Sequence, residues 1–158
     1  MSLQTVIFDG FQIERTVAAS PAEAFHAYTD RAAKAVWFDG GDAWEIFERS
    51  LDFRPGGTEV SVSRAAGGGD RYGYFARFHD IAPNERIVMS YDMEMNGERL
   101  STSLVVVEFQ AAGAGTRVVY SEAAVFAKGK DTVESRKDGC AWLLDQLAKY
   151  VEGAKVGA

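Results

Sequence analysis

The feature that most constrains the fold is a run of six short segments in which apolar and polar residues alternate. They span residues 44–53, 58–64, 71–81, 86–95, 100–110 and 116–126, with clusters of Gly, Pro, Asn or Asp between them. An alternation with a period of two is typical of strands that bury one face. Turns this short join neighbouring strands in an antiparallel arrangement. We therefore expect a six-stranded antiparallel meander.

A long amphipathic helix is predicted after the meander, over residues 131–152. Its apolar residues recur at the spacing of one helix face. The stripe comprises Val133, Lys137, Cys140, Leu144, Leu147 and Val151, with Leu143 beside it. A helix of about 20 residues is about 30 Å long, which is enough to cross a whole domain.

The residues before the meander predict one strand and two short helices. Residues 11–18 alternate as a half-buried strand, although Arg15 falls on its apolar side. The motif that begins at Ser20 supplies a helix N-cap, a proline at the first helical position and an acidic residue at N3. This helix is expected to bury Phe25 and Tyr28. A second short helix is expected over residues 30–36, and it carries Trp37 and Phe38 to the core.

This order of elements has few packing solutions, because only the sheet can cover the apolar stripe of the long helix. We predict an α+β fold in which a curved antiparallel sheet of about seven strands wraps around the C-terminal helix. The chain of 158 residues has the length of one domain. We therefore expect a single domain over residues 1–158, with its core at about 11–152.

Composition narrows the classes of partner and compartment. Seventeen basic and 23 acidic residues give a net charge of −6, which argues against binding to nucleic acid or to an anionic membrane surface. No apolar run approaches the length of about 20 residues that spans a bilayer. The N-terminus lacks the pattern of a secretion signal. The lone cysteine, Cys140, fits a reducing compartment. We expect a cytoplasmic protein without membrane insertion.

A set of turn and core motifs resembles a known family along nearly the whole chain. The motifs are Pro21 to Phe25, Thr29-Asp30, Trp37, residues 52–57, Gly73-Tyr74, Pro83, Gly115-Thr116-Arg117, Asp138-Gly139, Leu144 and Leu147. Their order resembles that of helix-grip proteins of the START-like superfamily (SRPBCC). Within it, the chain is most similar to the family homologous to the activator of heat-shock-protein-90 ATPase.

The resemblance implies the fold and several alternative functions. Members of the superfamily bind lipids, polyketides or other apolar ligands; some are cyclases or hydrolases, and others act on protein partners. The chain departs from the family pattern at Gly139-Cys140, where relatives often have Gly-Trp, and its tryptophan comes later, at Trp142. We expect a pocket to open beside Cys140, where a large ring is missing.

Candidate ligand contacts lie on the inward faces of the predicted elements. The set comprises Arg49, Met89, Tyr91, Met93, Tyr120, Glu122, Cys140 and Leu144. The methionines can adapt to an irregular apolar ligand, although ordinary core packing is the alternative for each residue. Arg15, Arg49 and Glu122 are charged residues on faces expected to point inward, and Arg49 shares its face with Phe47, Leu51 and Phe53. Either an Arg–Glu pair lies inside the cavity, or strand bulges return these residues to solvent.

Candidates for catalysis are few. Glu122 and His79 are the weak candidates for a catalytic group, with a surface position as the alternative for His79. No metal site is expected, because the two histidines lack further ligands at a suitable spacing. No cofactor is expected either.

Trp142 lies opposite the apolar stripe, on a face with Ser135, Asp138 and Gln146. It marks either a homodimer or protein-partner face, or it covers a loop. The preferred function is a binding or carrier domain for an apolar small molecule in the cavity between the sheet and the C-terminal helix. The alternatives are a cyclase- or hydrolase-type enzyme and a co-chaperone-like interaction module.

Overall fold

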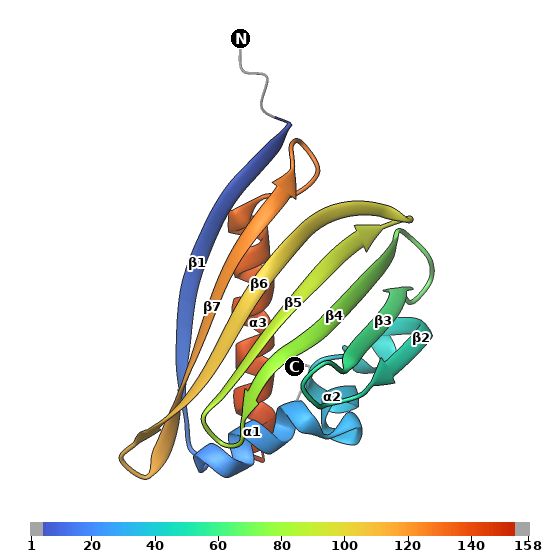
Figure 1. Cartoon of the computed structure of the whole chain (residues 1–158). Helices are drawn as coiled ribbons and strands as arrows, with labels where there is room; N and C mark the ends of the chain where they lie inside the picture. The colour runs from blue at the N-terminus through green and yellow to red at the C-terminus, as the bar shows by residue number, and fades with distance from the viewer. Residues whose placement is uncertain (1–4, 154–158) are drawn as a thin grey trace.

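A computed structural model describes residues 5–153, which form one curved antiparallel sheet of seven strands packed against helices (Figure 1). The elements in chain order are β1 (Val6–Val17), α1 (Pro21–Thr29), α2 (Arg31–Trp37), the 3-10 turn η1 (Gly41–Ala43), β2 (Trp44–Leu51), β3 (Thr58–Ala65), β4 (Arg71–Ala82), β5 (Arg86–Met95), β6 (Glu98–Ala112), β7 (Gly115–Ala127) and α3 (Val133–Val151). The predicted α+β helix-grip fold is confirmed.

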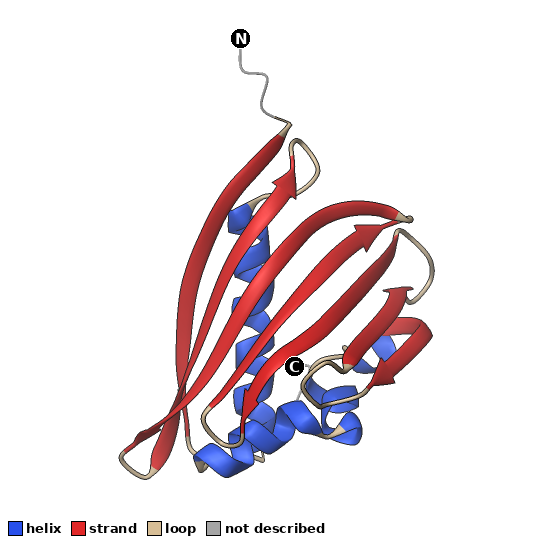
Figure 2. Ribbon diagram, viewed as in Figure 1, coloured by secondary structure: helices blue, strands red, loops and turns tan. Residues whose placement is uncertain are grey.

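The strand order is β1-β7-β6-β5-β4-β3-β2, so β2 to β7 form the predicted meander. β1 forms the other edge of the sheet, where it pairs antiparallel with β7 from Val6↔Ala127 to Val17↔Thr116. β1 therefore begins at Val6, five residues before the predicted start at residue 11. Figure 2 shows that the helices lie on one face of the sheet, with α3 running along it and α1 and α2 at one end.

Each α-helix begins at a side chain that caps free backbone N–H groups. Ser20 and Glu23 form the predicted capping box of α1, with Ser20 Oγ 3.2 Å from the Glu23 N–H. Asp30 caps α2 by accepting from Ala32, and Thr132 caps α3 by accepting from Ser135. The helix boundaries therefore follow from local sequence.

The core lies where α1, α2 and the C-terminal half of α3 meet the sheet. Phe25 packs edge-on against Phe109 at 5.5 Å between ring centroids, and Tyr28 packs against Trp37 at 4.9 Å. Leu147 of α3 is fully buried in the same cluster. Aromatic rings fill this end of the molecule, and the sheet beyond it is covered by α3 alone (Figure 1).

Two expectations about inward faces were wrong. Lys137 is exposed, and Arg136 occupies the buried face of α3 four residues before Cys140. Phe47 is 40% exposed because the pairing of β2 with β3 shifts register between Ile46 and Glu48. Such a bulge inserts one residue and reverses the alternation. Phe47 therefore lies outside the core, with Arg71 3.8 Å from its ring centroid.

Among the described residues, no helix is long and apolar enough to cross a membrane.

Candidate functional site

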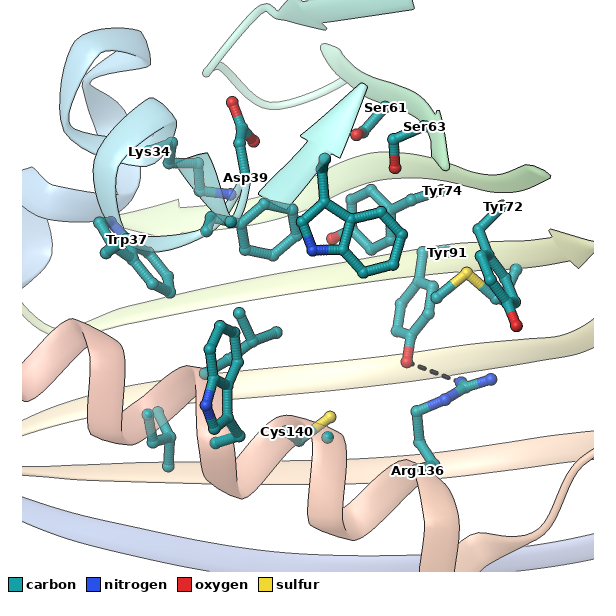
Figure 3. Close-up of a pocket in the computed structure, with 18 of the residues that line it drawn as sticks. Lys34, Trp37, Asp39, Ser61, Ser63, Tyr72, Tyr74, Tyr91, Arg136 and Cys140 are labelled. Carbon is teal, nitrogen blue, oxygen red and sulfur yellow. Dashed lines mark hydrogen bonds between the residues drawn. The ribbon is translucent and has the colours of Figure 1, made fainter. Parts of the chain in front are cut away.

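A cavity of about 390 Å³ lies between the concave face of the sheet, α2 and α3 (Figure 3). Its volume falls at the lower end of the range of about 300–1,000 Å³ that is typical of small-molecule sites. Most of its lining is aromatic or aliphatic. The lining includes Trp37, Trp44 and Trp142, which are all three tryptophans of the chain.

Six of the eight predicted ligand contacts line this cavity. They are Met89, Tyr91, Met93, Tyr120, Cys140 and Leu144. Arg49 and Glu122 lie directly behind the wall, where each bonds to residues that do line it. The inward phase predicted for both charges is correct, because the side chain of Arg49 is 4% exposed and that of Glu122 is fully buried.

Glu122 is held by hydroxyl groups from three strands. Its Oε2 accepts hydrogen bonds from Tyr91 and Ser103, each at 2.7 Å, and its Oε1 accepts one from Tyr120 at 2.7 Å. Burial, followed by the charges of neighbouring groups, raises the pKa values of Tyr91 and Tyr120 well above the usual 10.0. Both phenols therefore stay protonated at neutral pH and can keep donating to the carboxylate.

Arg136 supplies the countercharge from α3. Its Nη1 lies 3.2 Å from Glu122 Oε2 and 2.8 Å from the Tyr91 hydroxyl, and the latter bond is drawn in Figure 3. Its Nη2 donates to Ser101 at 2.6 Å and to Asp131 at 2.8 Å. We call Glu122, Asp131 and Arg136 the α3 cluster. Sequence reasoning missed Arg136, although a buried glutamate requires a cation and residue 136 lies one helical turn before Cys140.

Cys140 faces the cavity beside this cluster. Its Sγ lies 3.6 Å from the Tyr120 hydroxyl and 3.7 Å from Glu122 Oε1. Burial, and next the negative charge of Glu122, raise the pKa of the thiol to about 12. The residue is therefore a protonated thiol at neutral pH, and not the thiolate that acts as a nucleophile.

Arg49 belongs to a second buried group of charges, which sequence reasoning did not identify. Its Nε lies 2.9 Å from Asp39 and its Nη2 lies 2.8 Å from Glu59 Oε2, without the alignment of a hydrogen bond. Lys34 of α2 donates to Glu59 Oε1 at 2.6 Å. We call Lys34, Asp39, Arg49 and Glu59 the α2 cluster. The expected Arg–Glu pairing therefore occurs twice, but Arg49 does not pair with Glu122.

Lys34 shows how strongly this cluster is enclosed. Its side chain is 2% exposed, and its Nζ lies 4.6 Å from the ring centroid of Phe38. Burial lowers the pKa of Lys34 below its usual 10.5, and the attraction of Glu59 opposes that shift. Lys34 and Asp39 line the cavity, so each cluster forms part of its wall.

A second hollow of about 350 Å³ adjoins the cavity, and Trp44 and Trp142 line both spaces. Trp142 is 47% exposed. A side chain at Gly40, which has φ +78°, would collide with the Trp44 ring. The face of α3 that was predicted to point outward is not exposed along its whole length. Ser135 lines the cavity, and Gln146 is only 2% exposed.

The other candidates lie away from the cavity. His79 is exposed on the convex face, with Nε2 2.7 Å from Ser90 Oγ. Arg15 pairs with Asp145 of α3 at 2.7 Å, outside the cavity lining. In residues 5–153 no three His, Cys, Asp or Glu side chains are grouped so that they could hold a metal ion.

Comparison with known proteins agrees with this architecture. Residues 18–152 match the profile of the family described as Activator of Hsp90 ATPase homolog 1-like protein. The chain belongs to this family. The helix-grip fold of the START-like superfamily and the cavity under α3 are consistent with membership, and they support a ligand-binding domain in general. No functionally curated protein matches the chain at a significant level.

Solved structures of family-like proteins share the fold over almost their full length. The crystal structure of the Mll3558 protein from Rhizobium loti is 41% identical, with a TM-score of 0.85 over 93% of this chain and 99% of that one. An uncharacterized protein from Rhizobium leguminosarum is 35% identical, with a TM-score of 0.88 over 96% and 99%. An AHSA1-like protein from Aeromonas hydrophila is 20% identical, with a TM-score of 0.69 over 92% and 93%, and shows the fold alone.

Proposed function

We propose that this protein binds a small, predominantly apolar molecule in the cavity between the sheet and α3. The observation that carries the proposal is a hollow of about 390 Å³ beside a core that is otherwise filled with aromatic rings. Burying an apolar ligand there removes its surface and that of the lining from water, which is favourable by about 25 cal/mol per Å². The missing large ring at Cys140 leaves room for the ligand.

The contacts of Glu122, the catalytic candidate beside the cavity, and of the neighbouring Cys140 favour binding over catalysis. Glu122 already accepts from three hydroxyls and a guanidinium, and the thiol of Cys140 is protonated. Trp142 is 47% exposed and lines the cavity, so its position supports ligand access beside it.

The three tryptophans in the lining provide a direct test. Titration with N-phenylnaphthylamine, a neutral apolar dye, should quench tryptophan emission and raise dye emission with one saturable site. Gly139 lines the cavity, and a β-carbon added there meets no atom within 4 Å. Gly139→Phe should therefore fill the space and abolish binding, whereas the matched Gly139→Ala should retain it.

Unchanged dye binding in a folded Gly139→Phe variant, judged by circular dichroism, would show that the dye binds elsewhere and would overturn the proposal. Native mass spectrometry of the protein purified from its own cell extract should then reveal a retained small molecule in the wild type. The same mass spectrum reports whether the protein is a monomer or a dimer.

A further inference from the structure

The β3–β4 side of the cavity carries four residues with hydroxyl groups, which form two cross-strand pairs. Ser61 stands directly opposite Tyr74, and Ser63 stands opposite Tyr72, in the register of these strands. All four residues line the cavity. Figure 3 shows them on the side opposite Arg136 and Cys140 of α3. Strand pairing therefore gathers four polar groups on an otherwise aromatic wall.

These hydroxyls lack the protein hydrogen bonds that the hydroxyls of Tyr91 and Tyr120 make on the α3 side of the same cavity. Within residues 5–153, those of Ser61, Ser63 and Tyr72 make no hydrogen bond to protein, and that of Tyr74 makes only a contact of 3.8 Å with Met89 Sδ. Among the described residues, the enclosed polar atoms without a hydrogen bond are Arg49 Nη2 and Glu59 Oε2, so the hydroxyls of Ser61, Ser63 and Tyr72 are not sealed inside the protein. In contrast, Tyr91 and Tyr120 are both bonded to Glu122.

A hydroxyl group that faces a cavity both donates and accepts, and it is stable there only with a partner. In ligand sites, a few such groups in an apolar lining fix the orientation of the bound molecule. The four hydroxyls can therefore bind oxygen or nitrogen atoms at the edge of a ligand whose faces contact aromatic rings.

The charges around the cavity disfavour an ionised ligand. In the α2 cluster Lys34 and Arg49 face two carboxylates, and Asp39 also pairs with Arg31 at 3.2 Å, so three cations meet two carboxylates. The α3 cluster has one guanidinium for two carboxylates. Together with Arg31, the two clusters hold four cations and four carboxylates, so an ionised ligand of either sign would lose its hydration without gaining an unpaired countercharge.

We propose that the ligand is a neutral aromatic molecule bearing hydroxyl or carbonyl groups, and that Ser61, Ser63, Tyr72 and Tyr74 bind those groups. Phe38 and Tyr74, with ring centroids 5.4 Å apart, and the rings of Trp44 and Trp142 contact its faces. This inference rests on the proposed binding function and specifies its chemistry.

Four probes of similar size separate the two proposals. They are naphthalene, naphthol, naphthoate and naphthylmethylamine, and their affinities can be measured by equilibrium dialysis at neutral pH. Naphthol should bind about tenfold more tightly than naphthalene, because one or two hydrogen bonds give about that ratio. The anion and the cation should bind more weakly than naphthol.

Variants that remove only the hydroxyls assign the effect to this wall. Ser61→Ala with Ser63→Ala, and Tyr72→Phe with Tyr74→Phe, should each reduce the ratio of naphthol affinity to naphthalene affinity from about tenfold to about one. The control is Ser50→Ala, which removes an exposed hydroxyl of the neighbouring strand β2.

The outcomes are distinct. If naphthalene and naphthol bind equally, or if either charged probe binds most tightly, the ligand class is wrong while the proposed binding function stands. If naphthol preference survives in both double variants, the four hydroxyls are not its cause and the inference fails. If none of the four probes binds the wild type, the proposed function fails with it.

Discussion

The two buried charge clusters face the same cavity but hold their carboxylates in different ways. In the α2 cluster, the oxygens of Glu59 contact cations only, Lys34 at 2.6 Å and Arg49 at 2.8 Å. In the α3 cluster, Glu122 contacts one guanidinium and accepts from three hydroxyls. The first therefore depends on charge balance, and the second depends mainly on hydrogen bonds.

Each cluster also joins different elements. The α2 cluster ties α2 and the segment after it to β2 and β3, whereas the α3 cluster ties α3 to β5, β6 and β7. The two walls of the cavity are thus anchored independently to one continuous sheet. This arrangement keeps the walls apart, and it explains how a hollow persists beside a closely packed aromatic core.

Removing the charge of Glu59 should give the largest effect. Glu59→Gln leaves Lys34 and Arg49 buried with only Asp39 as a countercharge, and Asp39 also pairs with Arg31. Breaking such a buried pair costs about 3–5 kcal/mol. We expect urea unfolding to show a loss of this size. The matched control is Glu45→Gln, whose partner Arg64 is also 2.8 Å away but exposed, so the loss should be about 0–1 kcal/mol. Equal losses in the two variants would contradict the importance of charge balance.

The same change in the α3 cluster should cost less. Glu122→Gln keeps an oxygen that can accept from the hydroxyls, and Arg136 retains Asp131 at 2.8 Å. Hydrogen bonds to charged groups contribute about 1.5–3 kcal/mol, and we expect an unfolding free energy lower by about that amount. A loss as large as that of Glu59→Gln would show that the two clusters are equivalent. Glu14→Gln, at the exposed pair with Arg117, serves as the control.

The fold could be predicted from the sequence more completely than the two charge clusters could, and the reasons are physical. Turns and alternation are local signals, and they were sufficient for the meander and for α3. Arg136 was missed because residues three and four positions before Cys140 both project near the same helix face. The bulge between Ile46 and Glu48 displaced Phe47, and no local motif marks it.

The partners in each cluster come from distant parts of the chain. Lys34 and Glu59 are 25 residues apart, and Tyr91 and Arg136 are 45 apart, so no spacing rule connects them. The burial of Gln146 and the surroundings of Trp142 likewise depend on how α2 packs beside α3. A helical projection of α3 alone carries no information about that packing. Six of the eight predicted contacts nevertheless line the cavity, because strand alternation gives the direction of four of them and the apolar helix stripe gives that of Cys140 and Leu144.

Raising the pH toward 10 and above should change the stability contributed by groups at the two clusters in opposite directions. Tyr91 and Tyr120 have raised pKa values in the folded state, so above pH 10.0 the unfolded chain loses protons that the folded chain keeps, and this contribution to stability falls as pH rises. Lys34 has a lowered pKa, so its contribution increases with pH up to 10.5. Unfolding free energies measured across this range should fall less steeply in Tyr91→Phe than in the wild type. Parallel curves would contradict the assigned shift.

The smallest expected effect is on the alkylation rate of Cys140, whose thiol contacts Glu122 of the α3 cluster. Burial is the first cause of its raised pKa and the charge of Glu122 is the second, while Glu59 is not among the causes. Alkylation by iodoacetamide at neutral pH should therefore be slow in the wild type. It should be a few-fold faster in Glu122→Gln, because a lower pKa increases the thiolate fraction.

Glu59→Gln should leave this rate unchanged under conditions where circular dichroism shows the variant to be folded. If both variants accelerate alkylation equally, local opening of the structure is the cause in each, and the two clusters are coupled through the cavity. If only Glu122→Gln does so, the electrostatic influence of each carboxylate is confined to its own wall. That result would show why the cavity can hold charged groups on two sides and still present a neutral interior.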